Sequence, residues 1–195
     1  MEKTTKKIFV VGLIGIGIAI AILAMNANAI VTPSEVWVDD DFDSSTPGWG
    51  YDHFDTIQKG VDNVSAGGIV HVWNGTYNEN VDVGKTVTII GNGSASCIVT
   101  AADSDDSVFY VNADHVNIFG LNITGGSRGV LLKDNTDYCN ISDNILYNNG
   151  WGIGIYGKSG GTSLSYMSDN NVVMNNTILN NVNGIWMCIR HSITR

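Results

Sequence analysis

One spacing recurs at three places in the chain and limits its fold more than any other feature. Ile118 is followed by a Gly-aliphatic pair at 129, Ile141 by a second pair at 152, and Val173 by a third at 184, always after 11 residues. The extra residues between the second and third copies fall in one connecting segment, 157–171. Strand-turn-strand units of fixed length with one variable loop are typical of a coiled β-sheet, whose coils must stack to bury their inner faces. The spacing therefore predicts a β-solenoid with Ile118, Ile141 and Val173 in one core.

The composition agrees with a β-solenoid. The 195 residues are 44% hydrophobic and 15% charged, and they include 23 Gly and 22 Asn. Gly and Asn are poor in helix interiors and favoured in turns, so a helical bundle is disfavoured, and the hydrophobic content excludes a disordered chain. An antiparallel sandwich of short strands also fits frequent turns, but it does not require an 11-residue spacing. We therefore prefer the coil.

Residues 54–66 show the one convincing helical periodicity after the N-terminal segment. Asp55 is expected to cap this helix, with Gln58 three residues later completing a capping box. Gly67 and Gly68 are expected to end it. The apolar residues that fall on one face of the helix are Phe54, Ile57, Val61 and Val64.

The first 29 residues have the pattern of an export signal. Three lysines precede an apolar run over 8–25, and Ala27-Asn28-Ala29 follows it. A basic start, an apolar stretch and a small-residue site are typical of a cleaved secretory signal peptide. The run is also about long enough to span a bilayer, so an uncleaved N-terminal anchor is the alternative. Either interpretation places the rest of the chain outside the cytoplasm, secreted or at the cell surface, with only this segment touching a membrane.

The chain divides into five parts on these patterns. Residues 1–29 are the signal or anchor, 30–53 a first strand with an acidic turn region, and 54–66 a helix. Residues 67–187 carry the repeats, and 188–195 contain neither another full coil nor a cap. An open last coil leaves backbone groups unpaired and apolar core exposed, so we expect a truncated array or one completed by a partner that stacks on this end.

The repeat text resembles a known family. Residues 140–153 read Asn-Ile-Ser-Asp-Asn-Ile-Leu-Tyr-Asn-Asn-Gly-Trp-Gly-Ile, and residues 171–185 follow the same pattern. This text resembles the right-handed parallel β-helix proteins of the pectin-lyase-like fold, and more specifically the surface and periplasmic repeat proteins grouped with NosD. The resemblance covers nearly all of 36–187 and implies an all-β solenoid with a short helix capping its N-terminal end. It implies little about function, because this architecture hosts lyases, hydrolases, adhesins and passive stalks.

Two acidic groups are candidates for a Ca²⁺ site, because Ca²⁺ prefers oxygen ligands. One group precedes the helix and the other lies in a short loop, which lacks the central Gly and distal Glu of a calcium loop. A solvated acidic surface is the alternative for both. The candidate ligands are Asp39, Asp40, Asp41 and Asp43 in the first group, and Asp103, Asp105 and Asp106 in the second.

Several aromatic side chains are candidates for contacts with glycans. Aromatic rings on a rigid sheet can stack on sugar rings, but they also stabilise sheets by stacking on each other, and the sequence leaves both roles open. His71 alternates with two valines and is expected to face outward. The candidate glycan-contacting residues are Trp73, Trp151 and Tyr156.

Six Asn-x-Ser/Thr sequences are candidate glycosylation sites in an exported chain. Several such sequences arise by chance in a chain this rich in Asn, Ser and Thr. The candidates are Asn63, Asn74, Asn92, Asn122, Asn140 and Asn175.

The three cysteines, Cys97, Cys139 and Cys188, lie far apart and form no Cys-x-x-Cys pair. A disulfide-stapled scaffold is therefore excluded, since at most one bridge can form within the chain. We predict buried thiols.

The charge balance narrows the function. Without its first 29 residues the chain has 7 basic and 18 acidic residues, a net charge of −11, which excludes a basic nucleic-acid footprint and disfavours anionic polymers unless Ca²⁺ offsets the repulsion. A lyase needs a base and a cation, but Lys85, Arg128, Lys133 and Lys158 are scattered along the sequence.

The sequence favours a non-catalytic cell-surface scaffold or a module that contacts polysaccharide. The alternative is a polysaccharide lyase or glycoside hydrolase whose catalytic coils are missing or unrecognised.

Overall fold

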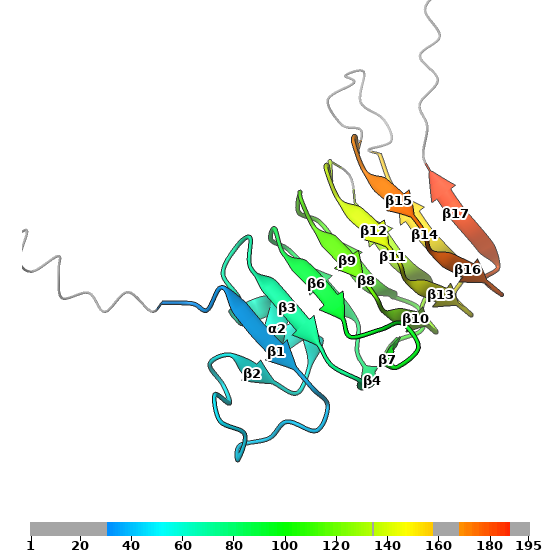
Figure 1. Cartoon of the computed structure of the whole chain (residues 1–195). Helices are drawn as coiled ribbons and strands as arrows, with labels where there is room; N and C mark the ends of the chain where they lie inside the picture. Colours follow the sequence, from blue (N-terminus) through cyan, green and yellow to red (C-terminus); the bar gives the residue numbers. More distant parts are fainter. Residues whose placement is uncertain (1–30, 134, 158–167, 188–195) are drawn as a thin grey trace, which may run out of the picture. The chain divides into compact units, whose positions relative to one another are not determined.

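The structure is a computed structural model that describes residues 31–133, 135–157 and 168–187 (Figure 1). Apart from Val31, these residues belong to one compact unit, Thr32–Arg195. The predicted signal or anchor, 1–29, and the predicted tail, 188–195, lie outside the described residues. Within the described part, no helix has the length and apolar character needed to cross a membrane.

The strands form three sheets, and every pairing between described strands is parallel. Sheet A runs in the order β15 (Val172–Met174), β12 (Asn140–Ser142), β9 (Asn117–Phe119), β6 (Thr88–Gly91), β3 (Ile69–Val72), β1 (Glu35–Val38) and β2 (His53–Phe54). Sheet B runs β16 (Thr177–Leu179), β13 (Ile145–Tyr147), β10 (Asn122–Thr124), β7 (Cys97–Thr100) and β4 (Gly75–Asn78). Sheet C runs β17 (Asn183–Met187), β14 (Trp151–Ile155), β11 (Arg128–Leu132), β8 (Ser107–Val111) and β5 (Val81–Val83).

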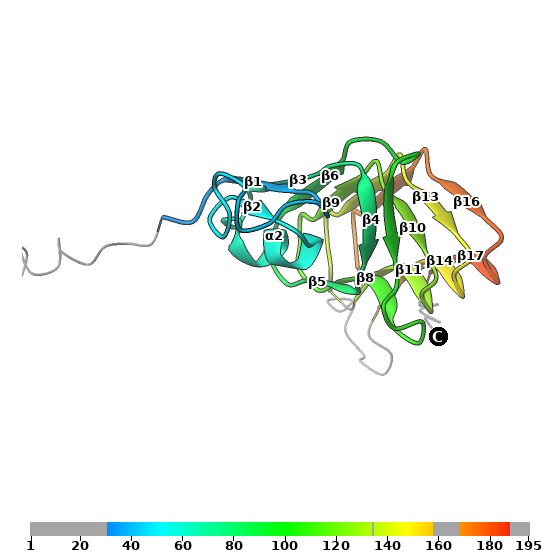
Figure 2. The ribbon, with the colours of Figure 1, turned by 90° about the horizontal axis from the view of Figure 1, so that it is seen from below.

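This arrangement is a parallel β-helix, as predicted, and it rules out the antiparallel sandwich. Successive coils each add one strand to each sheet, so the sheets extend along the coil axis (Figures 1 and 2). The register confirms the repeat alignment, because Ile118 pairs with Ile141 and Ile141 with Val173. Ile118 and Ile141 are fully buried and Val173 packs against the same core, so the three residues form one column.

The recurring glycine has a steric cause. A Cβ atom on Gly129 would lie 2.7 Å from the carbonyl oxygen of Gly152, and one on Gly152 would lie 2.7 Å from that of Gly184. Side chains are therefore excluded where successive coils approach most closely, while the residue that follows the glycine, such as Val130 or Ile153, is fully buried in the core. The close approach of successive coils therefore explains why each Gly-aliphatic pair contains a glycine.

Two asparagine ladders stabilise the turns between sheets. Asn144 Nδ2 donates to Asn176 Oδ1 at 3.2 Å, and the two residues occupy equivalent places in the repeat. A second ladder, from Asn149 Nδ2 to Asn181 Oδ1 at 3.1 Å, was not predicted. Each side chain also bonds the backbone of the preceding coil, and Asn149 Oδ1 accepts from the Gly126 amide at 3.0 Å. The ladders thus satisfy buried backbone groups that have no strand partner.

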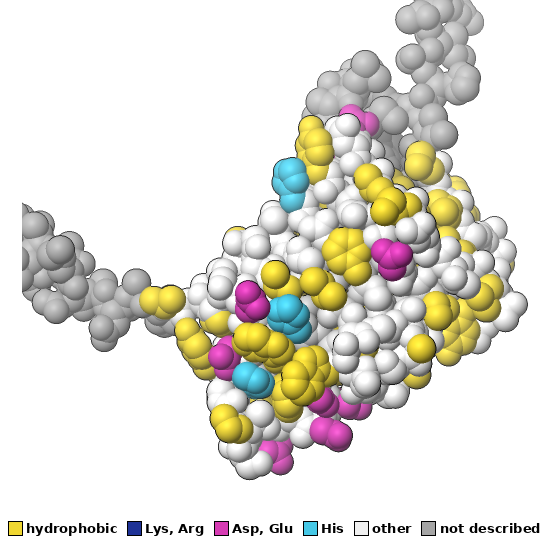
Figure 3. All heavy atoms as spheres, in the orientation of Figure 1, with side chains coloured by type: hydrophobic (Ala, Val, Ile, Leu, Met, Phe, Trp, Pro, Cys, Tyr) yellow, Lys and Arg dark blue, Asp and Glu magenta, His cyan; other side chains and the backbone are white. Residues whose placement is uncertain are grey.

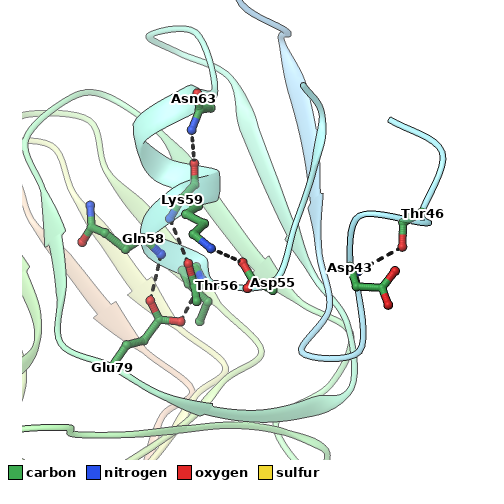
Figure 4. A network of polar contacts seen from close by, with 9 residues as sticks. Asp43, Thr46, Asp55, Thr56, Gln58, Lys59, Asn63 and Glu79 are labelled. Carbon is green, nitrogen blue, oxygen red and sulfur yellow. Dashed lines mark hydrogen bonds and ion pairs between the residues drawn. The ribbon is translucent and has the colours of Figure 1, made fainter. Parts of the chain in front are cut away.

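The helix is shorter than predicted. Helix α2 spans Ile57–Asn63, and Phe54 belongs to strand β2 instead. The N-cap is Thr56, whose Oγ1 accepts from the Lys59 amide at 3.3 Å, so the prediction of Asp55 as the cap was wrong. Asp55 instead accepts from Lys59 Nζ at 2.6 Å (Figure 4).

Residues of the first coil decide both ends of α2. The Glu79 carboxylate accepts from the amides of Ile57 at 2.8 Å and Gln58 at 2.9 Å, the positions a capping box leaves unpaired (Figure 4). At the other end, Lys85 Nζ donates to the Val64 carbonyl at 2.6 Å, and the C-cap is Val64, ahead of the predicted stop at Gly67. Opposite charges at the two ends match the helix dipole. The buried face of α2 covers the first coil, as a cap should (Figure 2).

Candidate glycan-binding surface

Seven side chains on the outer face of sheet A form a surface that we call the platform. In β1 and β3, Trp37 and His71 each lie between two buried valines, so strand alternation turns both rings outward. The parallel register continues this column, with His53 beside Trp37 and Ile90 beside His71. Figure 3 shows hydrophobic and histidine side chains gathered over this face. The platform comprises Trp37, Phe42, His53, His71, Trp73, Ile90 and Phe119.

Three stacked rings form the centre of the platform. The Trp37 ring lies between those of His53 and His71, with centroid separations of 5.4 and 5.5 Å and interplanar angles of 21° and 14°. Phe42 packs against the rings of His53 at 5.1 Å and Trp73 at 5.7 Å. Trp73 is 45% exposed and is the most accessible member of the group. Rings held in this way offer a flat, rigid aromatic surface to solvent.

A carboxylate pairs with each of the two histidines. Glu35 Oε2 lies 3.1 Å from His71 Nε2, and Asp52 Oδ1 lies 2.8 Å from His53 Nδ1. These contacts orient the rings at the two ends of the stack. They also place negative charge beside an apolar surface, a combination that suits a ligand with both a flat face and hydrogen-bond donors.

A shallow hollow of about 320 Å³ adjoins the platform and is lined by His71, Val72, Trp73, Ile90, Gly91 and Asn92. This volume is at the small end of the range for ligand pockets. Beneath it, the buried Tyr77 hydroxyl donates to the Trp73 carbonyl at 2.9 Å. Burial raises the pKa of Tyr77, so this hydroxyl stays protonated and keeps the Trp73 backbone in place.

The first acidic group is brought together only in part. Asp39, Asp40 and Asp41 each offer a carboxylate oxygen within 4.8 Å of the others. Asp43 is not in this group, and its Oδ1 accepts from Ser45 Oγ at 2.6 Å, a bond that lowers the pKa of Asp43. With one oxygen from each, the three carboxylates supply fewer than the six to eight oxygens that Ca²⁺ takes, so their second oxygens, backbone groups or water would have to complete a site. Calcium binding here stays a prediction.

The second acidic group forms a hydrogen-bonded loop between β7 and β8. Asp103 Oδ1 accepts from the Asp105 amide at 2.9 Å, and Asp106 Oδ1 accepts from the Ser107 amide at 2.7 Å. Among the described residues, only Asp39, Asp40 and Asp41 form a group of three converging metal-ligand side chains. The arrangement of the 103–106 loop therefore fits the solvated alternative better than a cation site.

The predicted aromatic residues separate into two groups. Trp73 belongs to the platform, whereas Trp151 and Tyr156 cluster beside sheet C. There Trp186 packs edge-on against Trp151 at 5.8 Å and Tyr156 at 4.6 Å. Arg128 Nη2 donates to Tyr156 Oη at 2.6 Å. In this second cluster the rings contact each other and an arginine, which favours the sheet-stabilising role that the sequence left open.

The sequence reasoning did not find the Trp37 stack. His53 and Trp37 lie far apart in sequence from His71, and only the parallel register makes them neighbours. A signal was nevertheless present, because Val36-Trp37-Val38 and Val70-His71-Val72 have the same alternation. Aligning these two segments as adjacent strands would have put the two rings side by side.

The described basic residues are all engaged away from the acidic groups of the platform. Lys59 Nζ donates to Asp55 and lies 5.7 Å from the Trp49 ring centre. Lys85 bonds the end of α2, Arg128 donates to Tyr156, and Lys133 Nζ lies 5.8 Å from the Tyr110 ring centre. Lys158 lies outside the described residues. On the platform face, no described lysine or arginine therefore joins the carboxylates as lyase chemistry requires (Figure 3).

The cysteines at 97 and 139 are buried and unbridged, as predicted. Burial raises the pKa of both thiols, and that of Cys139 to about 11. Both therefore stay protonated at neutral pH and are poor nucleophiles. Cys188 lies outside the described residues.

The candidate glycosylation sites differ in access. Four are exposed, whereas Asn122 and Asn140 are half-buried strand residues whose Oδ1 atoms are buried. Whether any of them carries a glycan stays a prediction. The exposed four are Asn63, Asn74, Asn92 and Asn175.

Parts of the chain are similar to known proteins. No protein-family model matches the chain. A stretch of 103 residues, 50% of the chain, is 38% identical to a protein of Methanothermus fervidus described as "Cell surface glycoprotein", and this stretch spans 17% of that protein's length. The crystal structure of an alginate lyase from Paenibacillus sp. str. FPU-7 is similar at 18% identity with a TM-score of 0.44, over 68% of this chain and 55% of that one. The chain's own parallel register, rather than either likeness, establishes that it is a parallel β-helix.

Proposed function

We propose that this chain is an exported cell-surface β-helix module that contacts glycans through the platform and performs no catalysis itself. The stack of Trp37 between His53 and His71, with the exposed Trp73 beside it, is the observation that carries the proposal. The surface location is supported by the apolar N-terminal segment and by the likeness to a cell surface glycoprotein.

The platform has the properties that sugar binding requires. A sugar ring has one flat, weakly apolar side that packs on aromatic rings, and hydroxyl groups at its edge that donate to carboxylates. Because the rings are mounted on strands and fixed by stacking, little conformational entropy is lost when a ligand binds. Glu35 and Asp52 supply hydrogen-bond acceptors at the two ends of the stack.

The proposal that the chain performs no catalysis rests on the positions of its carboxylates and basic side chains. Hydrolases of glycosidic bonds use two carboxylates at a controlled separation across the bond, and lyases use a base with a neighbouring cation. Glu35 and Asp52 are instead each held by a histidine, and the described lysines and arginine are engaged elsewhere. The alternative is a lyase or hydrolase completed by coils beyond this chain, and the experiment below tests for it through the release of products.

The test is a glycan-array screen of the purified protein, followed by titration of the best glycan against three variants. Trp73→Ala removes the most exposed ring of the platform and should weaken binding at least tenfold, about 1.4 kcal/mol. Trp151→Ala tests the second cluster, and we expect wild-type affinity. Tyr138→Ala removes another exposed aromatic ring, 54% accessible, and serves as the matched control.

Two outcomes would overturn parts of the proposal. Failure of every glycan to bind, or a loss with Trp151→Ala instead of Trp73→Ala, would remove the platform as the binding surface. Release of products from neutral or uronic-acid polysaccharides, with or without Ca²⁺, would show that the chain is an enzyme.

A further inference from the structure

The charges around the platform all have one sign. Glu35 and Asp52 border the ring stack, and the group Asp39, Asp40 and Asp41 follows directly on strand β1. Figure 3 shows acidic and histidine side chains on this face and no lysine or arginine among the described residues. A ligand that approaches the platform therefore meets a negative field without a fixed cation to offset it.

The carboxylates at the ends of the stack retain capacity to accept hydrogen bonds. Glu35 contacts His71 through Oε2, and Asp52 contacts His53 through Oδ1. Within the described part of the chain, their second oxygens have no hydrogen-bond partner. The Glu35 side chain is 50% exposed and that of Asp52 is 28% exposed, so a bound ligand can reach both.

We infer that the platform selects glycans that carry amino sugars with free, protonated amino groups. This inference rests on the proposed function and names the ligand class of the same surface. The aromatic rings take up the flat side of the sugar. The ammonium group donates charge-assisted hydrogen bonds to Glu35 or Asp52, which are stronger than the bonds of a neutral hydroxyl. Ammonium groups also interact favourably with the face of an indole ring.

The same charges exclude acidic sugars. A uronate on the platform would place its carboxylate beside Glu35, Asp52 and the Asp39–Asp41 group with no arginine or lysine to pair it. Juxtaposed like charges suppress the wrong partner by repulsion, which gives specificity without any further contact. Neutral, N-acetylated sugars should bind with intermediate affinity, since they keep the stacking and lose the charge.

The experiment compares three oligosaccharides of equal length by isothermal titration calorimetry with the wild-type protein. These are oligomers of glucosamine, of N-acetylglucosamine and of a uronic acid. We expect glucosamine oligomers to bind at least tenfold more tightly than the N-acetylated ones, and uronic-acid oligomers not to bind. Raising the ionic strength from about 0.01 M to about 1 M should remove most of the glucosamine advantage, because salt screens exposed charges.

Variants that keep the side-chain shape and remove the charge identify the residues that cause the preference for glucosamine. Glu35→Gln combined with Asp52→Asn should reduce the preference for glucosamine over N-acetylglucosamine to less than threefold, because the amide oxygens still accept hydrogen bonds but carry no charge. Asp82→Asn removes an exposed charge from strand β5 in sheet C and should leave the preference unchanged. Circular dichroism checks that each variant is folded, and the salt series on the wild type needs no variant.

The outcomes separate the inference from the proposed function. Equal or tighter binding of N-acetylated or uronic-acid oligomers would overturn the inference and leave a glycan-binding platform. The inference would also fail if Asp82→Asn reduced the preference as much as the double variant, since net charge alone would then explain it. If none of the three oligomers bound and the array were blank, the proposed function itself would fail.

Discussion

The two ends of the described solenoid use the same repeat and differ in what covers it. At the first coil, α2 and β1 cover the core, and Val36, Val70 and Ile57 are fully buried. At the last described coil, Ile185 is 51% exposed although it continues the column of Val130 and Ile153, which are fully buried. The comparison shows that an inward position in a β-helix becomes core only when another element covers it (Figure 1).

The first coil and the last described coil also differ in their charged residues. At the first coil, Glu79 and Lys85 close the ends of the covering helix, and Asp55 pairs with Lys59. Along the last described coil the exposed side chains are mainly apolar. They are Val172, Met174, Leu179, Val182, Ile185 and Met187. We propose, as the sequence led us to expect, that this end of the coil is a surface on which a partner stacks.

The largest effect should come from a charge placed in the shared column of sheet C. Ile153→Asp buries a carboxylate without a partner, at a cost of several kcal/mol, which is comparable to the stability of a typical domain, about 5–15 kcal/mol. We expect this variant not to fold, as judged by circular dichroism and urea denaturation. Ile185→Asp makes the same change at the next register position and should remain folded.

The Ile185→Asp variant also tests the stacking proposal. If the last described coil meets a partner, including a second copy of the chain, the variant should abolish association seen by analytical ultracentrifugation at high concentration. A wild-type protein that stays monomeric at all concentrations, with β17 strongly protected from hydrogen exchange, would contradict the proposal. Equal destabilisation by the two Asp substitutions would contradict the comparison of the two ends.

The ladder formed by Asn149 and Asn181 should also distinguish a covered coil from the last described coil, with a smaller difference in the free energy of unfolding. Asn149→Ala leaves the Gly126 amide and the Ile123 carbonyl without their side-chain partner inside the solenoid. Each unsatisfied buried group costs about 1–3 kcal/mol, so we expect a loss of about 3 kcal/mol in the free energy of unfolding. Asn181→Ala should cost less, about 1 kcal/mol, because Asn181 is itself only half-buried in the last described coil and water can take the place of its amide. Chemical denaturation of both variants measures the difference, and a larger loss for Asn181→Ala would be inconsistent with it.

Alanine substitutions at two equivalent glycines, one in a covered coil and one in the last described coil, should differ by a smaller free energy. Gly152→Ala brings a methyl group against the Gly184 carbonyl oxygen and Ile178 Cγ2, at 2.7 and 2.8 Å, and should destabilise the protein by about 1–3 kcal/mol. Gly184→Ala meets nothing within 4 Å in the described structure and should be neutral or slightly stabilising. Melting temperatures of the two variants provide the measurement. Equal shifts would show that strand propensity, rather than the approach of the next coil, explains the glycine.

The smallest predicted effect concerns the cap of α2. Glu79→Gln should cost about 1 kcal/mol, because one amide oxygen replaces a carboxylate that accepts from two backbone amides. Burial raises the pKa of Glu79 above its ordinary value of 4.5. The folded state therefore takes up a proton more readily than the unfolded chain, and this contribution to stability is fully present below pH 4.5 and lost as pH rises through the folded pKa. The stability gap between wild type and Glu79→Gln should widen as pH falls from neutral towards 4.5, and a gap that narrows would contradict this assignment.

The parts of the fold that could be predicted depend on local repetition. Ile118, Ile141 and Val173 were aligned correctly because coils of one solenoid have the same steric needs at the same positions. The second ladder, at Asn149 and Asn181, follows the same 32-residue shift and was available to the same reasoning. The ends of α2 were not predictable in this way, because Glu79 and Lys85 reach it from the first coil, 21 residues further along the chain.

The candidate site was predicted only in part. Trp73 was identified as an exposed aromatic residue, but Trp151 and Tyr156 belong to a separate cluster, and the ring stack at Trp37 was missed. His53 carries no local signal for a shared surface, and the alternation around His71 indicates only that its ring faces outward. Their contact with Trp37 depends on the order β2-β1-β3, in which the first described strand lies between two strands that follow it in the sequence.

The amino-acid sequence by itself determined that the chain coils, which residues face the core and where the coils approach too closely for a side chain. These properties follow from periodicity and side-chain volume, which are written along the chain. The tertiary structure alone decided which side chains meet across coils, such as Trp37 with two histidines and Glu79 with the amides of α2. Parallel strands join residues that are tens of positions apart, and the register that sets their contacts is a property of the assembled sheet rather than of any single segment.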